Sequence, residues 1–234
     1  MKPSLNLVPK HVGIILDGNR RFAKQLMIKP WKGHEWGAKK VEKIIDWCKE
    51  FKIKELTLYT FSIENFDRPK REFNYLMKLF EKEFENFKNN QKVNEVKVNF
   101  IGRISMFPKN IQILMNKIMN KTKHNIGTII NFAMAYGGRA EIIDAVRKLS
   151  KDLKSKKVNI SKINEEFFKN YLYTKSEPDL IIRTSESRLS GFLLYQSAYS
   201  EIIFLPKKLW PEFSKKDFVK CLENYSNRER RFGR

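Results

Sequence analysis

Short apolar runs and amphipathic segments alternate along almost the whole chain. Residues 11–16 form an apolar run that ends at Asp17-Gly18-Asn19, which is the pattern of a buried strand closed by a tight turn. Residues 37–51 place their apolar side chains at helical spacing, and residues 55–61 are again rich in strand-forming residues. By the same criteria we expect helices at 71–87, 108–119 and 138–149, and strands at 93–101, 128–135, 202–205 and directly after Pro178.

This alternation predicts the fold class. A repeated order of strand, helix and strand is typical of an α/β domain in which a mostly parallel central β-sheet is flanked by helices on both faces. Residues 151–166 are polar and resemble a linker, but the stretch is short and we find no internal repeat. We therefore predict a single domain over residues 1–234, with binding groups gathered at the carboxyl ends of the strands.

Composition excludes several classes of protein. The chain of 234 residues is 41% hydrophobic and 13% aromatic, which is the range of an ordinary globular protein and not of a disordered one. No apolar run approaches the length of a membrane span, and Pro9, Lys10 and His11 interrupt the stretch that a signal peptide would need. We expect a cytoplasmic protein. Cys48 and Cys221 lie far apart, without the spacing of a zinc site.

The charge of the chain is strongly positive. Its 47 Lys and Arg residues against 26 Asp and Glu give a formal net charge of +21. Such an excess fits an anionic partner, which could be a nucleic acid, an anionic membrane surface or a phosphorylated small molecule. A general bias toward Lys, Asn and Ile would give the same number without any binding site. Charge alone therefore leaves the partner open.

The segment from Asp17 to Ala23 contains the largest concentration of candidate functional residues. A Gly-Asn turn leaves backbone N–H groups free, the following helix adds its positive end, and Arg20 and Arg21 add forked donors, so the segment suits a phosphate. A carboxylate beside a phosphate is repulsive unless a cation lies between them, and Mg²⁺ is commonly held by one or two carboxylates together with substrate phosphates. The alternative is a favourable turn with solvated arginines.

Polar residues also follow the second strand and precede the first long helix. His34, between glycines, can donate to an oxyanion, although a lone histidine is more often structural. Residues 62–69 come directly after the second strand. There, Asn65 could orient a proton transfer and Arg68 could bind a phosphate, or the segment could be a capped loop.

A second anion site is indicated near the carboxyl end of the chain. The strand after Pro178 opens into a loop that carries Arg183, Arg188 and several hydroxyl groups, and Glu201 is a second carboxylate that could reach a metal. Two phosphate sites with an acidic metal ligand between them suggest transfer between two phosphorylated substrates. The motifs of P-loop nucleoside triphosphatases and of dinucleotide-binding enzymes are absent from the sequence, which argues against both classes.

Taken together, these segments resemble the cis-prenyltransferase family, in the order in which that family has them. Asp-Gly-Asn-Arg-Arg-Phe-Ala and Pro-Trp-Lys-Gly-His-Glu-Trp-Gly-Ala are most similar to archaeal members. The resemblance extends from Pro9 to Arg234 and points to undecaprenyl or related polyprenyl diphosphate synthases. The segments that carry it are residues 11–23, 33–37, 56–69, 136–139, 179–185 and 227–233.

The resemblance implies a Mg²⁺-dependent transferase that adds isopentenyl diphosphate repeatedly to an allylic prenyl diphosphate with a C15 or C20 chain. It forms a cis double bond at each step and yields a long, undecaprenyl-like precursor of a glycosyl carrier lipid. By similarity, Asp17 is catalytic and binds Mg²⁺ with Glu201, and Asn65 assists proton removal. The residues implied in substrate binding are Gly18, Asn19, Arg20, Arg21, Phe22, His34, Ser62, Ile63, Glu64, Phe66, Arg68, Arg183, Arg188, Leu189 and Ser190.

A hydrocarbon product needs an apolar tunnel. The predicted helix at 71–87 and the strand around Phe132 could supply its wall, with most of their apolar side chains in the ordinary core. The candidate wall residues are Leu76, Met77, Phe80, Phe84 and Phe132. Pro30 stands where the family commonly has an arginine, so Lys29 or Lys32 could replace that contact.

The family also suggests a homodimer, and the remaining lysines could hold the enzyme near anionic lipid as a peripheral membrane protein. Two rival functions remain. A basic nucleic-acid-binding protein would explain the charge, but no recognition motif of that class is present, so we expect no nucleic-acid partner. A non-catalytic subunit of a heteromeric prenyltransferase would lack the metal-binding aspartate that Asp17 supplies.

Overall fold

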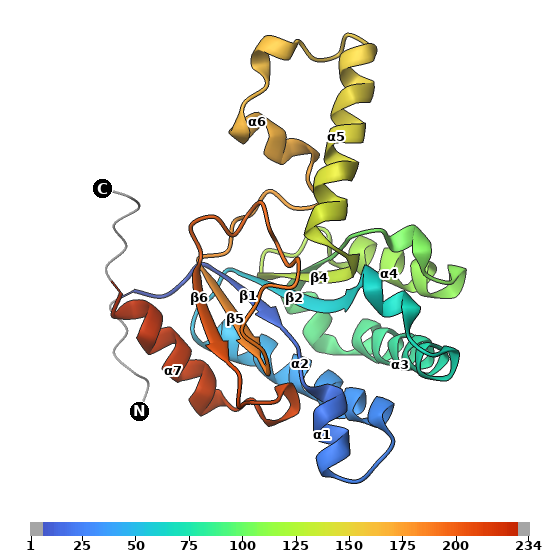
Figure 1. Cartoon of the computed structure of the whole chain (residues 1–234), viewed down its shortest axis with the longest axis vertical. Helices are drawn as coiled ribbons and strands as arrows, with labels where there is room; N and C mark the ends of the chain where they lie inside the picture. The colour runs from blue at the N-terminus through green and yellow to red at the C-terminus, as the bar shows by residue number, and fades with distance from the viewer. Residues whose placement is uncertain (1–6, 229–234) are drawn as a thin grey trace.

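Six parallel strands form the centre of the structure, a computed structural model that describes residues 7–228. Their order in the sheet is β3-β4-β2-β1-β5-β6, and every neighbouring pair is parallel (Figure 1). The predicted mostly parallel sheet is thus confirmed. The strands are β1 (His11–Ile15), β2 (Glu55–Ser62), β3 (Val96–Ile101), β4 (Thr128–Tyr136), β5 (Leu180–Thr184) and β6 (Glu201–Leu205).

Across residues 7–228 there are seven α-helices, joined to the strands by short loops and 3₁₀ turns. Two helices were not predicted, the short α6 and α7. Helix α7 begins after Ser214, whose side chain accepts from the Asp217 amide at 3.2 Å while its own amide donates to Asp217 at 2.9 Å. The helices are α1 (Asn19–Gln25), α2 (Gly33–Glu50), α3 (Lys70–Asn89), α4 (Lys109–Thr122), α5 (Gly138–Lys154), α6 (Glu165–Phe168) and α7 (Lys215–Ser226).

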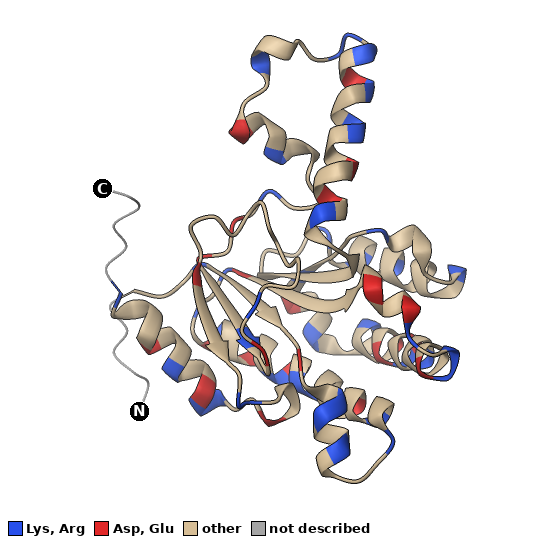
Figure 2. Ribbon diagram, in the orientation of Figure 1, with Lys and Arg blue, Asp and Glu red and all other residues tan. Residues whose placement is uncertain are grey.

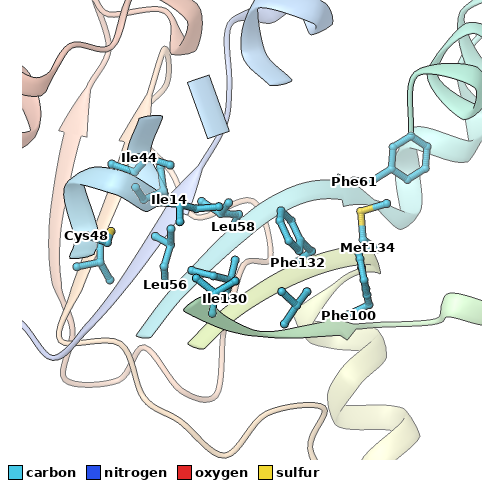
Figure 3. Close-up of a cluster of buried hydrophobic side chains, with 14 of the residues drawn as sticks. Ile14, Ile44, Cys48, Leu56, Leu58, Phe61, Phe100, Ile130, Phe132 and Met134 are labelled. Carbon is cyan, nitrogen blue, oxygen red and sulfur yellow. The ribbon is translucent and has the colours of Figure 1, made fainter. Parts of the chain in front are cut away.

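Most of the helices pack on one face of the sheet and form the main core with it. Figure 3 shows Ile44 and Cys48 of α2 beside Ile14, Leu56 and Leu58 of the central strands. Helices α3, α4 and α7 add their apolar stripes to the same cluster. These strands are buried on both faces, which is why they read in the sequence as continuous apolar runs instead of alternating ones.

The other face of the sheet carries a smaller cluster. Tyr59 of β2 stacks on Phe192 with ring centroids 5.0 Å apart, and both pack with Tyr136 and Leu193. Phe192 and Leu193 come from the turn-rich segment between β5 and β6, so an irregular segment covers much of this face where we expected helices.

The polar stretch at residues 151–166 does not separate domains. Helix α5 continues through it to Lys154 and projects away from the sheet, and the chain returns through α6 (Figure 1). Tyr171 donates to Asp152 at 3.0 Å and Phe168 packs on Tyr195, with ring centroids 5.4 Å apart, so the returning chain contacts α5 and the segment between β5 and β6. Within residues 7–228, no helix is both long and apolar enough to span a bilayer.

Candidate functional site

A cavity of about 700 Å³ opens where β1, β2 and β5 end and extends between α2 and α3. Parallel strands bring their carboxyl ends to one edge of the sheet, so loops that are far apart in the sequence meet there. The two phosphate sites inferred from the sequence therefore form one mouth. The predicted site residues that line this cavity are Asp17, Gly18, Asn19, Arg20, Arg21, His34, Ser62, Glu64, Asn65, Arg68, Arg183 and Ser190.

Asp17 joins the two anion sites. Arg183, at the end of β5, donates from Nη2 to Asp17 Oδ2 at 2.9 Å and from Nη1 to Ser190 Oγ at 2.6 Å. Arg21 Nη2 lies 3.4 Å from the same Asp17 oxygen. Thr184 donates to the Asp17 carbonyl at 2.7 Å, as does the Trp210 amide at 2.9 Å, so the backbone at Asp17 is fixed from two sides.

The mouth also contains polar atoms that the protein itself leaves unsatisfied. Arg183 Nε, Ser185 Oγ and Asn19 Oδ1 are buried and have no hydrogen-bond partner among the described residues. Buried polar groups are normally paired. Asn19 Oδ1 is an acceptor, whereas Arg183 Nε and Ser185 Oγ can donate, and unpaired donors at the end of a sheet are expected where an anion binds. Their position beside Asp17 supports an anionic ligand at this edge.

Glu186 bridges two of the predicted phosphate-binding arginines. Its Oε1 lies 2.9 Å from Arg21 Nη1, and its Oε2 lies 2.8 Å from Arg188 Nη1. The Arg188 side chain is 65% exposed and points to a carboxylate instead of the cavity. An anion that engages Arg21 and Arg188 together would have to exchange with Glu186.

Gly18 shapes the turn that presents Asp17. Its φ of 109° lies in the region that favours glycine, and a Cβ at this position would stand 3.0 Å from both Leu209 Cα and Ser185 Oγ. The turn therefore needs a residue without a side chain. Asn19 follows and donates to the Leu16 carbonyl at 3.2 Å, which starts α1 directly beside the cavity.

A second cluster of charges lies on the α3 side of the mouth. Arg68 Nη1 lies 3.0 Å from Glu72 Oε1 and 3.2 Å from His34 Nε2, and Arg20 Nε lies 3.9 Å from the same glutamate oxygen. Glu72, only 3% exposed, was missed by the sequence analysis. The available signal was its position four residues before Leu76, on the apolar face of the helix, where an unpaired acid would be costly.

The pKa values in this cluster shift in the directions that its contacts dictate. Burial lowers the pKa of His34, with Arg68 acting in the same direction and Glu72 opposing it. The pKa of Glu72 is also lowered, first by the His34 ring, whose Nε2 lies 3.8 Å from Glu72 Oε1, and then by the charges of Arg68 and Arg20. The cluster thus holds a neutral imidazole and an ionised carboxylate side by side.

The segment after β2 is both a capped turn and part of the cavity wall. Asn65 Oδ1 accepts from the Ser62 amide at 3.2 Å and caps the 3₁₀ turn Ile63–Asp67. Phe66 packs in the core, 5.1 Å from the Phe61 ring, so the side chain predicted to contact substrate is part of the hydrophobic core. The capped loop is therefore present, and the catalytic and phosphate-binding roles of Asn65 and Arg68 stay predictions.

Other predicted residues surround the cavity without lining it in the described part of the chain. The Phe22 ring lies 5.9 Å from Trp36, Ile63 lies beside Gly137, and Leu189 packs in the smaller core cluster. Lys29 and Lys32, the candidates to replace the missing arginine, are exposed and also lie outside the lining.

Glu201 does not lie between the two anion sites. It pairs with Leu180 at the start of β5, whereas Ile15, just before Asp17, pairs with Arg183 near the end of that strand. Three residues of strand separate the two levels by about 10 Å. The separation follows from the direction of the strands. Glu201 begins β6 and Asp17 follows the end of β1, and because the two strands are parallel these residues lie toward opposite edges of the sheet. Glu201 is paired with Arg228 instead.

The far part of the cavity is almost wholly apolar, as the sequence predicted. Helix α3 lines it from Leu76 to Phe87, which corresponds to about 16 Å of helix axis. Of the predicted wall residues, Leu76, Phe80, Phe84 and Phe132 line it and Met77 does not. Other apolar wall residues include Ala38, Val41, Phe61, Leu79, Phe87 and Phe100.

Two carboxylates interrupt the apolar wall. Glu83 of α3 and Glu42 of α2 both line the cavity. Burial raises the pKa of Glu83, and the nearby Glu42 acts in the same direction although neighbouring lysines oppose it. The wall between α2 and α3 is thus apolar near the sheet and polar at these two positions.

Comparisons with known proteins agree with this geometry. Residues 15–233 match the family described as "Putative undecaprenyl diphosphate synthase". The tritrans,polycis-undecaprenyl-diphosphate synthase (geranylgeranyl-diphosphate specific) of Pyrococcus horikoshii is 46% identical over 100% of this chain and 90% of that protein. An isoprenyl transferase of Thermus thermophilus is 44% identical over 97% of this chain and 89% of that relative.

Solved structures agree as well. Lavandulyl diphosphate synthase from Lavandula x intermedia, in complex with dimethylallyl diphosphate, has a TM-score of 0.91 and 33% identity over 97% of this chain and 99% of its own. A probable undecaprenyl diphosphate synthase from Campylobacter jejuni has a TM-score of 0.81 and 31% identity over 98% of this chain and 100% of its own. The resemblance seen in the sequence motifs is confirmed, and the chain belongs to the undecaprenyl diphosphate synthase family of cis-prenyltransferases.

Proposed function

We propose that the protein elongates a C20 allylic diphosphate with successive isopentenyl diphosphate units to a long-chain polyprenyl diphosphate. One observation carries the proposal: a single cavity joins a mouth of arginines around Asp17 to an apolar interior between α2 and α3. The mouth suits diphosphates and the interior suits a growing hydrocarbon chain. Relatives named as geranylgeranyl-diphosphate specific favour a C20 primer over a C15 primer.

The arginines of the mouth would stabilise the departing diphosphate. The main barrier of such a transfer is separation of diphosphate from a developing allylic cation, so charge placed in advance around the leaving group lowers it. Arg20, Arg21 and Arg68 line the side of the mouth nearest α1 and α3 and would bind the allylic diphosphate. Arg183 and Ser190, bonded to each other at 2.6 Å, would bind isopentenyl diphosphate.

Asp17 fits a Mg²⁺ ion that is shared with substrate. Within residues 7–228 no group of three or more acidic, histidine or cysteine side chains could hold a metal alone, and Mg²⁺ typically uses one or two carboxylates plus substrate phosphates. Both ion pairs of Asp17 use Oδ2, and Ser185 and Arg183 beside it have unsatisfied polar atoms. When bound, Mg²⁺ would neutralise charge on the leaving diphosphate.

Asn65 would position the second substrate rather than act as a strong base. Its Oδ1 already accepts from the Ser62 amide, which fixes the side chain at the edge of the cavity. An amide has almost no basicity, so the departing diphosphate is the better proton acceptor. His34, kept neutral by burial, would donate one hydrogen bond to the allylic diphosphate.

We also propose a homodimer in which α5 contributes to the interface. Ile143 and Val146 lie one turn apart on this helix and are 49% and 45% exposed. Helix α5 projects away from the sheet in Figure 1, which makes its exposed apolar side chains available to a second copy of the chain. Light scattering after gel filtration would show a dimer for the native chain and a monomer for Ile143→Asp.

The direct test is to incubate the purified protein with labelled isopentenyl diphosphate, geranylgeranyl diphosphate and Mg²⁺ and to extract the product into organic solvent. We expect primer-dependent label in the organic phase, and its near-complete loss in Asp17→Asn. Asp67→Asn is the matched control, because Asp67 is exposed on the neighbouring turn and does not line the cavity. Absence of organic label with every primer from C10 to C20 would overturn the proposal.

A further inference from the structure

The corner where α1 meets α2 exposes an unusual group of apolar side chains. Met27 is 93% exposed, Leu26 is 44% exposed, and Trp36, which faces the same region from α2, is 41% exposed. Met27 has a φ of 53° in the turn that ends α1, so the backbone holds its side chain out of the fold. In Figure 1, α1 and the loop after it extend from the lower end of the molecule. We call residues 24–32 with Trp36 the α1 corner.

The same corner is rich in basic residues, and the acid next to it in the sequence, Glu35, accepts a hydrogen bond from Tyr75. Residues 18–34 contain five Lys and Arg residues and no Asp or Glu. Arg20 and Arg21 belong to the cavity mouth, but Lys24, Lys29 and Lys32 are exposed at the corner, where α1 is marked only in blue (Figure 2). Lys29 Nζ lies 5.8 Å from the centre of the Trp31 ring, so a cation and an amphipathic ring are held together at its base.

We propose that the α1 corner docks on an anionic lipid bilayer. Exposed aliphatic tips flanked by tryptophan and lysine are the composition that inserts shallowly at the headgroup boundary, and each lysine gains from the negative surface potential. The occupant is a bilayer and not an acidic protein, because the most exposed residue of the corner is an unbranched methionine and the corner extends from the end of the molecule (Figure 1). Single exposed apolar side chains are common on protein surfaces. This corner differs because its exposed apolar side chains lie in a segment, residues 18–34, that has five basic residues and no acidic ones.

Docking here would place the cavity beside the membrane. Phe22 and Trp36 pack together at the base of the corner, and on the other side of the same short helix Asn19, Arg20 and Arg21 line the cavity mouth. The α2–α3 wall of the cavity begins next to this corner. A lipid product made in the cavity would then leave close to a bilayer. The docking itself does not require that reaction.

Vesicle sedimentation tests the proposal. The full chain is mixed with vesicles of phosphatidylcholine alone or of phosphatidylcholine with phosphatidylglycerol, at low and high salt. We expect binding to the anionic vesicles at low salt and weak binding to neutral ones. Met27→Asp should lower the partition coefficient by about tenfold, because it replaces an inserting side chain with a repelled charge.

Ile126→Asp is the matched control. Ile126 is 100% exposed, on the turn after α4 and away from the α1 corner, so the same change of chemistry should leave vesicle binding at the native level. Absence of native binding to anionic vesicles, an unchanged partition coefficient in Met27→Asp, or an equal loss in Ile126→Asp would each overturn the proposal. Prenyl transfer measured in detergent separates membrane docking from the proposed prenyltransferase activity, since Met27→Asp should retain that activity in full.

Discussion

Replacing Glu72 by glutamine would remove the carboxylate that Arg68, His34 and Arg20 share. Glu72 is 3% exposed and its Oε1 lies 3.0 Å from Arg68 Nη1. Removing one partner of a fully buried ion pair costs about 3–5 kcal/mol, but the Arg68 side chain is 20% exposed and partly hydrated, so we expect about 2 kcal/mol. For a chain of this size that corresponds to a fall in Tm of about 4–8 °C.

The pH dependence gives a sharper form of the same prediction. The pKa of Glu72 is lower in the folded protein than its ordinary value of 4.5, so the carboxylate stabilises the fold above pH 4.5 and this contribution is lost as the pH falls. The free-energy difference between the native chain and Glu72→Gln should therefore be full at pH 7 and should shrink progressively in acid. Urea unfolding followed by circular dichroism measures it.

A suitable control lies on the same helix. Glu85 is paired with Lys88 on the exposed side of α3, so Glu85→Gln should leave the urea midpoint close to that of the native chain. The reasoning would be refuted if Glu72→Gln changed the unfolding free energy by less than about 0.5 kcal/mol. A difference that stayed constant from pH 7 into acid would also refute it.

Three further predictions follow from the site. Gly18→Ala should destabilise the fold by about 1–3 kcal/mol in urea, because φ is 109° and the new Cβ meets Leu209 Cα at 3.0 Å. Glu83→Gln should raise the unfolding free energy at pH 7, and the gain should vanish in acid where the carboxyl is neutral anyway, since burial raises its pKa. Ser190→Ala, which removes the 2.6 Å bond to Arg183, should raise the steady-state KM for isopentenyl diphosphate by about tenfold with little change in kcat.

Much of the fold follows from patterns that the sequence carries openly. Each of the six strands lies where a strand was expected. Strands β1 and β5 are buried throughout and contain continuous apolar runs, whereas the edge strand β3 alternates buried and half-buried residues over most of its length. The cavity mouth could also be predicted from the sequence. Asp17 follows β1 and Arg183 lies near the end of β5, and parallel strands share one carboxyl edge.

The features that were not predicted depend on contacts between residues that are far apart in the sequence. Glu201 was expected at the metal site by similarity, but it opens β6 and pairs with Leu180, so it lies toward the edge of the sheet opposite Asp17. Glu72 was overlooked because its partners Arg68 and His34 come from two other segments. Helix α7 was not predicted, although Ser214 and Asp217, three residues apart, form a capping box at its start.

The cavity has a consequence for the lifetime of any product. Phe80, Phe84, Phe100 and Phe132 belong both to its wall and to the main core, so the empty protein has a void where other folds have packed side chains. A hydrocarbon that fills the void restores those contacts and stabilises the fold, by about 2.7 kcal/mol at a hundredfold excess over Kd. The contacts that make the product-bound protein more resistant to heat are the same contacts that slow dissociation of the product. Turnover would then be limited by product release, and the Tm would rise with the time for which the product stays bound.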